Sequence, residues 1–144
     1  MSQKIIGSFE SVVLPELGDT SVVAKIDTGA YSGAVHCTDI RVVTRDGVEK
    51  LQFHPYGIKA VMVEAESFRV RNVRSSTGHQ VRRYLIDTTI CINEVAYQTA
   101  IGLSDRTDLK FEVLLGRRFL REQNILVDTR INQHLDPDVG GEVK

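Results

Sequence analysis

The chain has 144 residues, of which 42% are hydrophobic and 26% are charged, and its formal net charge is −1. This length favours a single domain, and the balanced charge gives no overall field that would attract nucleic acid or a membrane. No segment approaches the roughly 18 apolar residues of a membrane span, and the first residues hold too short an apolar run for a signal peptide. We therefore expect a cytoplasmic protein with no nucleic-acid or membrane partner, in which Cys37 and Cys91 are free thiols.

Short strands follow one another along most of the chain. Runs rich in Val, Ile, Thr and Tyr, often alternating with polar residues, cover residues 11–17, 21–27, 39–55, 61–73, 80–92 and 95–103. This pattern predicts a mainly β protein. Asp46-Gly47 predicts a hairpin, because both residues tolerate the positive φ that a two-residue turn needs, and Asn93-Glu94 predicts a second hairpin.

One helix and a tail complete the predicted order. The helix starts near Arg117 and continues through RFLREQN, with Phe119 and Leu120 on its apolar face and Asn124 near its end. We expect residues 1–135 to form the single domain. Residues 136–144 are polar and contain one Pro and two Gly, so they are expected to be a disordered tail.

The segment AKIDTGA, residues 24–30, places one carboxylate between an apolar run and a glycine. In such a turn, backbone N–H groups can hold the Asp27 carboxylate, while Gly29 lets another backbone or a substrate come close. The alternative is a plain Asx turn, in which Asp27 satisfies only local amides. A second motif, VLLGR at residues 113–117, is a short apolar strand that passes through a glycine into the predicted helix.

Together these two motifs resemble the retropepsin-like aspartic peptidases, which carry an apolar-apolar-Asp-Thr-Gly-Ala loop and, later, an apolar-apolar-Gly-Arg strand before a short helix. The resemblance covers residues 20–128 and places Ser75–Gly78 where that family has its flap. AKIDTGAYSGAVH, VRSSTG and EVLLGRRFL are more narrowly similar to the bacterial RimB family, once labelled ATP-dependent zinc proteases. The fold implied is a closed β-barrel with one short C-terminal helix and half of the active site. A hairpin around residues 39–56 departs from the retroviral enzymes.

The resemblance also implies the chemistry. Aspartic peptidases use two carboxylates that share a proton, one activating water and the other protonating the substrate carbonyl. Asp87 and Asp128 each precede Thr but lack the following Gly, and the chain is too short for two lobes. We therefore expect a homodimer that contributes Asp27 twice, on its symmetry axis.

Roles of the neighbouring residues follow by the same resemblance. Thr28 braces the paired loops, and Gly29 and Ala30 allow close approach of substrate. Gly116 and Arg117 are structural: the Gly allows close packing near the loop, and the Arg forms a buried or interfacial ion pair. Ala30 lacks the hydroxyl that a Ser would offer to the carboxylate, so we hypothesise a pH optimum nearer neutrality than that of secreted acid proteases.

The expected flap is strongly basic. Residues 69–83 contain no Asp or Glu, and their arginines are Arg69, Arg71, Arg74, Arg82 and Arg83. One interpretation is a solvated hairpin with outward arginines. The other is a flap that closes over an acidic chain, with Ser76, Thr77, Gly78, Arg74 and Arg82 touching the substrate. The second agrees with what the RimB resemblance implies, namely processing of glutamate-rich tails made by an ATP-grasp ligase.

Two other functions are open on sequence alone. One is a non-catalytic, dimeric β-barrel module that binds acidic peptides without cutting them. The other is a zinc-dependent peptidase, although the chain has no HExxH and its histidines and cysteines show no paired ligand spacing. No phosphate-binding loop is present, so the sequence gives no support for use of ATP by this chain. With no paired ligand spacing either, we expect neither a metal nor a cofactor.

Overall fold

Strands make up most of the regular structure in the computed structural model, which describes residues 4–74 and 78–141. The strands are β1 (Lys4–Ile6), β2 (Phe9–Val13), β3 (Ser21–Ile26), β4 (Ala34–Arg45), β5 (Val48–Pro55), β6 (Val63–Ala65), β7 (Arg69–Arg74), β8 (Gln80–Ile92), β9 (Val95–Ser104), β10 (Val113–Leu115) and β11 (Ile125–Val127). The helical segments are η1 (Pro15–Leu17), α1 (Arg117–Glu122), η2 (Gln133–Leu135) and α2 (Pro137–Gly141). The prediction of a mainly β protein is confirmed. In these ranges no helix is long and apolar enough to cross a membrane.

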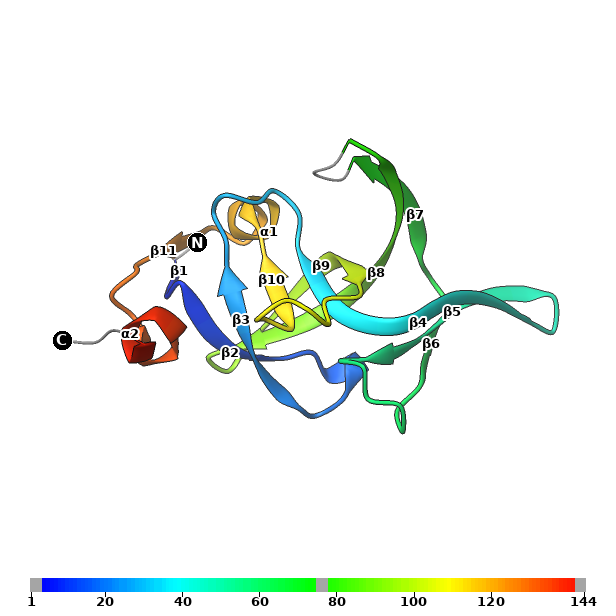
Figure 1. Ribbon diagram of the computed structural model, residues 1–144, viewed down its shortest axis with the longest axis horizontal. Coiled ribbons are helices and arrows are strands. Elements are labelled where there is room, and N and C mark those ends of the chain that lie inside the picture. The colour runs from blue at the N-terminus through cyan, green and yellow to red at the C-terminus, as the bar shows by residue number, and fades with distance from the viewer. Residues whose placement is uncertain (1–3, 75–77, 142–144) are drawn as a thin grey trace.

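The main sheet returns to its starting strand. Its order is β10-β3-β2-β8-β9-β4, and β4 then pairs with β10, so these strands form a ring (Figure 1). Strand β10 lies between β3, to which it is parallel, and β4, to which it is antiparallel. The two motifs found in the sequence are therefore neighbours, because the residue after β3 is Asp27 and the residue after β10 is Gly116.

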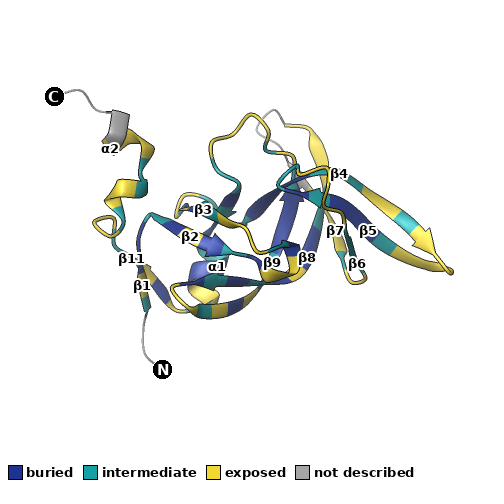
Figure 2. Ribbon diagram, turned by 90° about the horizontal axis from the view of Figure 1, so that it is seen from below, coloured by how far each residue is buried: buried dark blue, intermediate teal, exposed yellow. Residues whose placement is uncertain are grey.

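Buried side chains fill the inside of the ring, and along the strands they alternate with more exposed ones. In β8, Ile86, Thr88, Ile90 and Ile92 are buried while Asp87 is exposed, as expected when successive side chains point to opposite faces. The centre of the molecule is buried and the ends of the projecting hairpins are exposed (Figure 2). Burying an Ile or Leu side chain contributes about 1.5–3 kcal/mol, so this face is the main source of stability.

Both predicted hairpins and the predicted helix are confirmed. Asp46-Gly47 joins β4 to β5 and Asn93-Glu94 joins β8 to β9, each pair with positive φ. In α1, Phe119 and Leu120 are buried. The chain leaves this helix through Asn124, whose φ of 57° is the left-handed conformation that ends helices.

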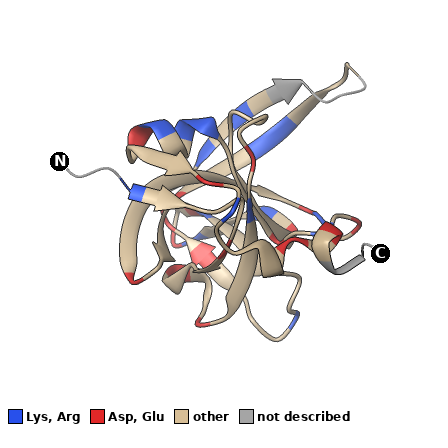
Figure 3. Cartoon of the chain, turned by 90° about the vertical axis from the view of Figure 1, so that its left-hand side faces the viewer, with Lys and Arg blue, Asp and Glu red and all other residues tan. Residues whose placement is uncertain are grey.

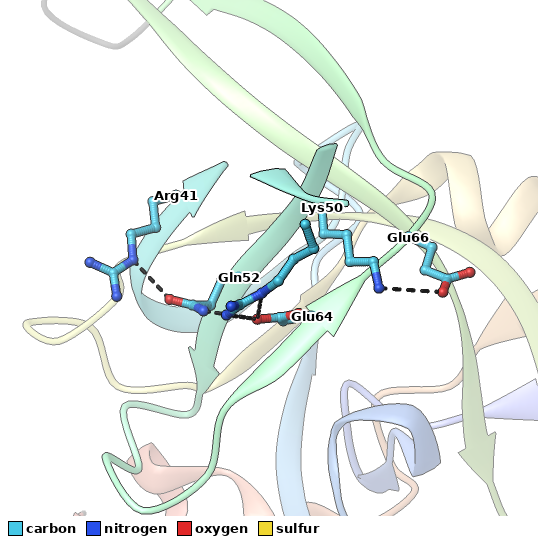
Figure 4. A network of polar contacts seen from close by, with 6 residues as sticks. Arg41, Lys50, Gln52, Glu64 and Glu66 are labelled. Carbon is cyan, nitrogen blue, oxygen red and sulfur yellow. Dashed lines mark hydrogen bonds and ion pairs between the residues drawn. The ribbon is translucent and has the colours of Figure 1, made fainter. Parts of the chain in front are cut away.

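The β4–β5 hairpin projects from the body as an arm, residues 39–56, beside β6 (Figure 1). A change of register between Thr38 and Arg41 marks its base. Side chains then fasten it to β6: Gln52 accepts from Arg41 Nε at 2.8 Å and donates to Glu64 Oε2 at 3.0 Å (Figure 4). Arg45 Nη2 also donates to Glu64, at 2.7 Å.

The structure differs from the expectation of a disordered tail over residues 136–144. Residues 137–141 form α2, whose first residue is Pro137. Proline has a fixed φ that suits the first turn of a helix, and the Asp136 carboxylate accepts the Asp138 N–H at 2.9 Å, as an N-cap does. Residues 142–144 lie outside the described residues.

Candidate active site

The loop of residues 27–30 is fixed by its own backbone. It begins where β3 ends, and the Asp27 N–H donates to the Leu115 carbonyl at 2.8 Å. The Ala30 N–H donates to the Asp27 carbonyl at 3.2 Å, which closes the turn. Asp27 is half-buried, whereas Thr28 and Gly29 are exposed. The loop therefore presents its residues at the surface while its ends are tied to the core strands.

The backbone of Gly29 binds the Asp27 carboxylate. Its N–H donates to Asp27 Oδ1 at 2.9 Å. A Cβ on residue 29 would lie 3.1 Å from the same oxygen, so glycine leaves the carboxylate room to take this position. Within the described residues, no hydrogen bond reaches Oδ2. The turn is of the Asx type weighed above, and it leaves one oxygen of an oriented carboxylate available to another molecule.

The first residues of α1 bind the end of the loop through their backbone N–H groups. The Arg117 N–H donates to the Ala30 carbonyl at 2.8 Å, and the Arg118 N–H donates to the Tyr31 carbonyl at 3.0 Å. A Cβ on Gly116 would lie 2.5 Å from the Tyr31 carbonyl oxygen and 2.7 Å from that of Ala30. Only glycine allows this approach of helix and loop.

Within the described residues of this one chain Arg117 binds a carbonyl, and an ion pair of Arg117 across an interface stays a prediction. Its Nη1 donates to the Thr28 carbonyl at 3.1 Å, and its guanidinium carbon lies 5.8 Å from the centre of the Tyr31 ring. Thr28 and Arg117 line a hollow that extends along the surface to Leu126 on β11. The arginine thus braces the loop that carries Asp27.

The two other Asp-Thr pairs are held by arginines. Asp87 binds Arg69 through both oxygens, at 3.0 and 3.1 Å, and these bonds lower the pKa of Asp87. Asp128 accepts from the backbone and the guanidinium of Arg130, which lowers the pKa of Asp128 to about 2. The Asp128 turn resembles that of Asp27, because the N–H two residues later donates to Oδ1 in both. The difference is that an arginine guanidinium binds both oxygens of Asp87 and of Asp128, whereas within the described residues Asp27 Oδ2 accepts no hydrogen bond.

The expected flap is the β7–β8 hairpin, and its tip is only partly described. Ser75, Ser76 and Thr77 lie outside the described residues, and Gly78 is exposed with a φ of 88°. The backbone of Arg74 pairs with that of Gln80. The hairpin places the flap arginines of the sequence along one projecting element (Figure 3).

These arginines differ in their partners. Arg69 is paired with Asp87, so its charge is already matched. In the described ranges Arg71 and Arg82, both exposed, have no ion pair, and half-buried Arg83 has none either. The free positive charge of the flap therefore lies toward its tip and on β8.

The histidine and cysteine nearest the loop have structural surroundings. Buried His36 accepts the Arg106 N–H through Nδ1 at 2.8 Å. Cys37 is a buried free thiol whose pKa is raised to about 12 by burial, and Cys91 is a free thiol too. Among the residues that the structure describes, no group of three or more His, Cys, Asp or Glu is placed to hold a metal ion.

Two residues near the loop went unnoticed in the sequence. A Cβ on Gly33 would lie 2.8 Å from the Leu114 carbonyl oxygen, so this glycine lets the chain pass β10 on its way to β4. The carbonyl and the ring of Tyr31 both contact the start of α1. The spacing GAYSG, with a second glycine four residues after the first, was the available signal.

Comparisons with known proteins agree with this geometry. Residues 5–134 match the model of a family described as RimB-like, retropepsin-like aspartic endopeptidase RimB. Proteins named probable alpha-L-glutamate ligase, from Desulfotalea psychrophila and Shewanella pealeana, are 31% and 30% identical over 88% and 85% of this chain. The chain spans 28% of the length of each ligase.

A solved structure shares the fold. A protein of unknown function from Legionella pneumophila superposes with a TM-score of 0.71 at 25% identity, over 90% of this chain and 96% of that one. The resemblance found in the two sequence motifs is confirmed by the family match. The chain belongs to the RimB-like family of retropepsin-like aspartic endopeptidases.

Proposed function

We propose that the protein is an aspartic endopeptidase that works as a homodimer, each closed β-barrel supplying one Asp27. The observation that carries the proposal is the Asp27 carboxylate itself, oriented by the Gly29 N–H at 2.9 Å on a loop tied to Leu115 and to the start of α1. A carboxylate on so constrained a loop suits positioned acid–base chemistry, because little reorganisation is needed when the substrate binds.

In the dimer the two Asp27 carboxyls share one proton. Two like charges about 3 Å apart cannot both ionise cheaply, so one carboxyl stays protonated. The ionised one removes a proton from water, which attacks the peptide carbonyl carbon, while the protonated one donates to the carbonyl oxygen. Proton transfer to the leaving nitrogen then allows the C–N bond to break.

Exposed apolar side chains beside the loop support a dimer. Ile5 on β1 and Leu126 on β11 are 54% and 49% exposed, and they stand on paired neighbouring strands. The hollow that contains Leu126 also contains Thr28, one residue from Asp27. A second copy packed over this surface by a two-fold axis would bury the apolar side chains and bring the two loops together.

The substrate we propose is an acidic, glutamate-rich chain in the cytoplasm. The flap arginines Arg71 and Arg82, which form no ion pair within residues 4–74 and 78–141, offer planar guanidinium groups that suit carboxylates. The matched relatives are named as glutamate ligases, and they extend well beyond the region shared with this chain. A peptidase of such tails would act on the product of an ATP-grasp ligase.

The test is hydrolysis of an oligoglutamate peptide, carried out with and without a chelator and followed by mass spectrometry. We expect cleavage by the wild type and by Asp87→Asn, and none by Asp27→Asn. Asp87→Asn is the matched control, because it makes the same change at a carboxylate paired with Arg69. An active monomer in sedimentation would contradict the dimer.

Other outcomes point to the two remaining functions. Binding of the peptide without cleavage by any variant would favour the non-catalytic module. Cleavage by Asp27→Asn that stops only on adding chelator would favour a zinc-dependent peptidase. Oligoglutamine of equal length, cleaved as fast as oligoglutamate, would overturn the proposed preference for acidic chains.

A further inference from the structure

The loop between β9 and β10, residues 105–112, is tied at both ends to His36 on β4. Strand β9 ends at Ser104, which is the partner of His36 in the sheet. The chain returns at Glu112, whose carbonyl accepts the His36 N–H at 2.7 Å. One residue of β4 therefore joins the two ends of this segment, which we call the 105–112 loop.

The imidazole of His36 forms a third contact with the 105–112 loop. Its Nδ1 accepts the Arg106 N–H at 2.8 Å. Because a backbone N–H can only donate, Nδ1 must be the nitrogen without a proton, and the neutral ring then carries its proton on Nε2. Arg106 also closes the loop on itself, since its Nε donates to the Phe111 carbonyl at 3.0 Å.

The His36 ring has little room to turn away from this partner. The residue is only 8% exposed. A Cβ on Gly57 would lie 3.1 Å from His36 Nε2, so the glycine leaves the space that the ring occupies. The Tyr56 N–H donates to the His36 carbonyl at 2.8 Å and holds this turn against β4. A change in the charge of the ring must therefore be met by its neighbours.

Protonation would exchange one partner of the ring for another. A charged imidazole carries a proton on both nitrogens, so Nδ1 could no longer accept the Arg106 N–H. Asp105 Oδ1 lies 4.0 Å from Nδ1 and could become its acceptor if the loop shifted. In the present geometry this oxygen accepts the N–H and the hydroxyl of Thr107. Each charge state of His36 thus has its own partner in the 105–112 loop.

Other titratable groups adjoin His36 from the neighbouring elements. They are Glu112 before β10, Tyr56 after β5 and Cys37 on β4. In the described ranges Glu112 Oε2 and the Tyr56 hydroxyl are buried without a hydrogen-bond partner. Burial raises the pKa of Tyr56 and that of Cys37, the latter to about 12, so neither ionises near neutral pH. The titration of Glu112 has to be separated from that of His36 by experiment.

We propose that His36 is a positioning residue: its neutral ring holds the 105–112 loop against β4, and its protonation releases the loop. This inference rests on the proposed function, because the loop adjoins the proposed site at two places. Asp105 lines a hollow together with residues of the flap strand β8. The loop also leads directly into β10, whose Leu115 carbonyl accepts the Asp27 N–H. Substrate binding should therefore weaken as the pH falls through the ordinary range of histidine, near pH 6.5.

The first measurement follows the wild type by NMR between about pH 5 and about pH 8. The ring nitrogens of His36 report its protonation, and the amide of Arg106 reports the position of the loop. We expect the Arg106 amide proton to move upfield and to exchange faster with water as the ring gains its proton, with one shared midpoint. An amide that stays unchanged while the ring titrates would overturn the inference. A ring that stays neutral throughout this range would overturn it too.

The second measurement uses two substitutions that separate the hydrogen bond from the charge. In His36→Asn the side-chain oxygen can replace Nδ1 as the acceptor, whereas in His36→Gln the amide group reaches the place of Nε2. Binding of fluorescein-labelled oligoglutamate is read by anisotropy, in protein that carries Asp27→Asn so that no peptide is cut. With His36 present, affinity should fall about fivefold between about pH 7.5 and about pH 5.5, the effect of one lost hydrogen bond. His36→Asn should lose this dependence, and His36→Gln should bind weakly at both pH values.

Two further variants serve as controls. His54→Gln removes another imidazole beside a carboxylate, that of Asp39 at 3.7 Å, and Glu112→Gln removes the neighbouring acid. Both should keep the fivefold change. Its loss in either control would overturn the inference, and so would its persistence in His36→Asn, which protonation of the peptide alone would produce. If the wild type does not bind oligoglutamate, the proposed function fails, and the NMR measurement still decides the role of His36.

Discussion

The Asp27 loop and the arm lie at opposite ends of β4 and are held in different ways. Backbone groups fix the loop: amides of Asp27, Arg117 and Arg118 donate to carbonyls, and Gly116 allows the contact. The arm has backbone ladders between β4 and β5 and between β5 and β6, and side chains add further ties, through Glu64 and its two partners Arg45 and Gln52. A backbone contact has no freedom to rearrange, whereas exposed side chains have many rotamers. We therefore expect substitutions that add atoms in the Asp27 loop to lower stability strongly. Substitutions that remove a side-chain contact of the arm should lower it little.

The largest expected effect is at Gly116. Gly116→Ala would place a methyl group 2.5 Å from the Tyr31 carbonyl oxygen, so either the loop or α1 must move. We expect a loss of about 3 kcal/mol in the free energy of unfolding, measured in urea, together with loss of peptide cleavage. Gly47→Ala is the comparison on the arm, where nothing lies within 4 Å and only the φ of 78° is strained. An equal loss there would contradict the distinction.

At Gly29 we expect a substitution that lowers the rate of peptide cleavage but leaves the free energy of unfolding nearly unchanged. In Gly29→Ala the new Cβ would lie 3.1 Å from Asp27 Oδ1, while the N–H that binds this oxygen remains. The carboxylate must shift by a few tenths of an ångström. We expect kcat/KM for oligoglutamate to fall about tenfold with little change in the urea midpoint. Unchanged kcat/KM would show that the position of this oxygen is uncritical.

A pH effect is expected from Glu16, which ties η1 to the ring. Burial opposes its ionisation, but hydrogen bonds from Thr89 and Thr88 outweigh this and lower the pKa of Glu16 below its ordinary value of 4.5. The ionised carboxylate therefore stabilises the fold above pH 4.5, and this contribution is lost as the pH falls through the lower folded value. At pH 7 the urea concentration at the midpoint of unfolding should be lower for Glu16→Gln than for the wild type. The difference between the two midpoints should disappear in acid. A constant gap would argue against ionisation as the cause.

The smallest effect is expected on the arm. Glu64→Gln removes a carboxylate whose pKa is lowered by the hydrogen bond from exposed Arg45. Exposed ion pairs contribute little, since water and salt screen them. We expect a minor fall in Tm and unchanged cleavage of oligoglutamate. A change in cleavage would connect the arm to the substrate site.

The same contrast explains what the sequence could predict. The turns at Asp46-Gly47 and Asn93-Glu94, and the loop and strand motifs around Asp27 and Gly116, depend on local backbone requirements that few residues meet. The sequence alone therefore predicts these turns and motifs.

Contacts between distant side chains were not predictable. The sequence counts Arg69 among the free charges of the flap, but the sheet register places it opposite Leu85, from where its guanidinium binds Asp87, two residues further along β8. The helix α2 was missed since Pro and Gly outweighed the N-cap signal of Asp136.

The insertion of β10 between β3 and β4 has a consequence for synthesis. The loop residue Thr28 and its support Arg117 are 89 positions apart in the chain. A ribosome makes Asp27 early, but the strand and the helix that orient it emerge only when most of the domain has been translated. The Asp27 loop therefore cannot take the geometry described above until the chain has been made as far as Arg117.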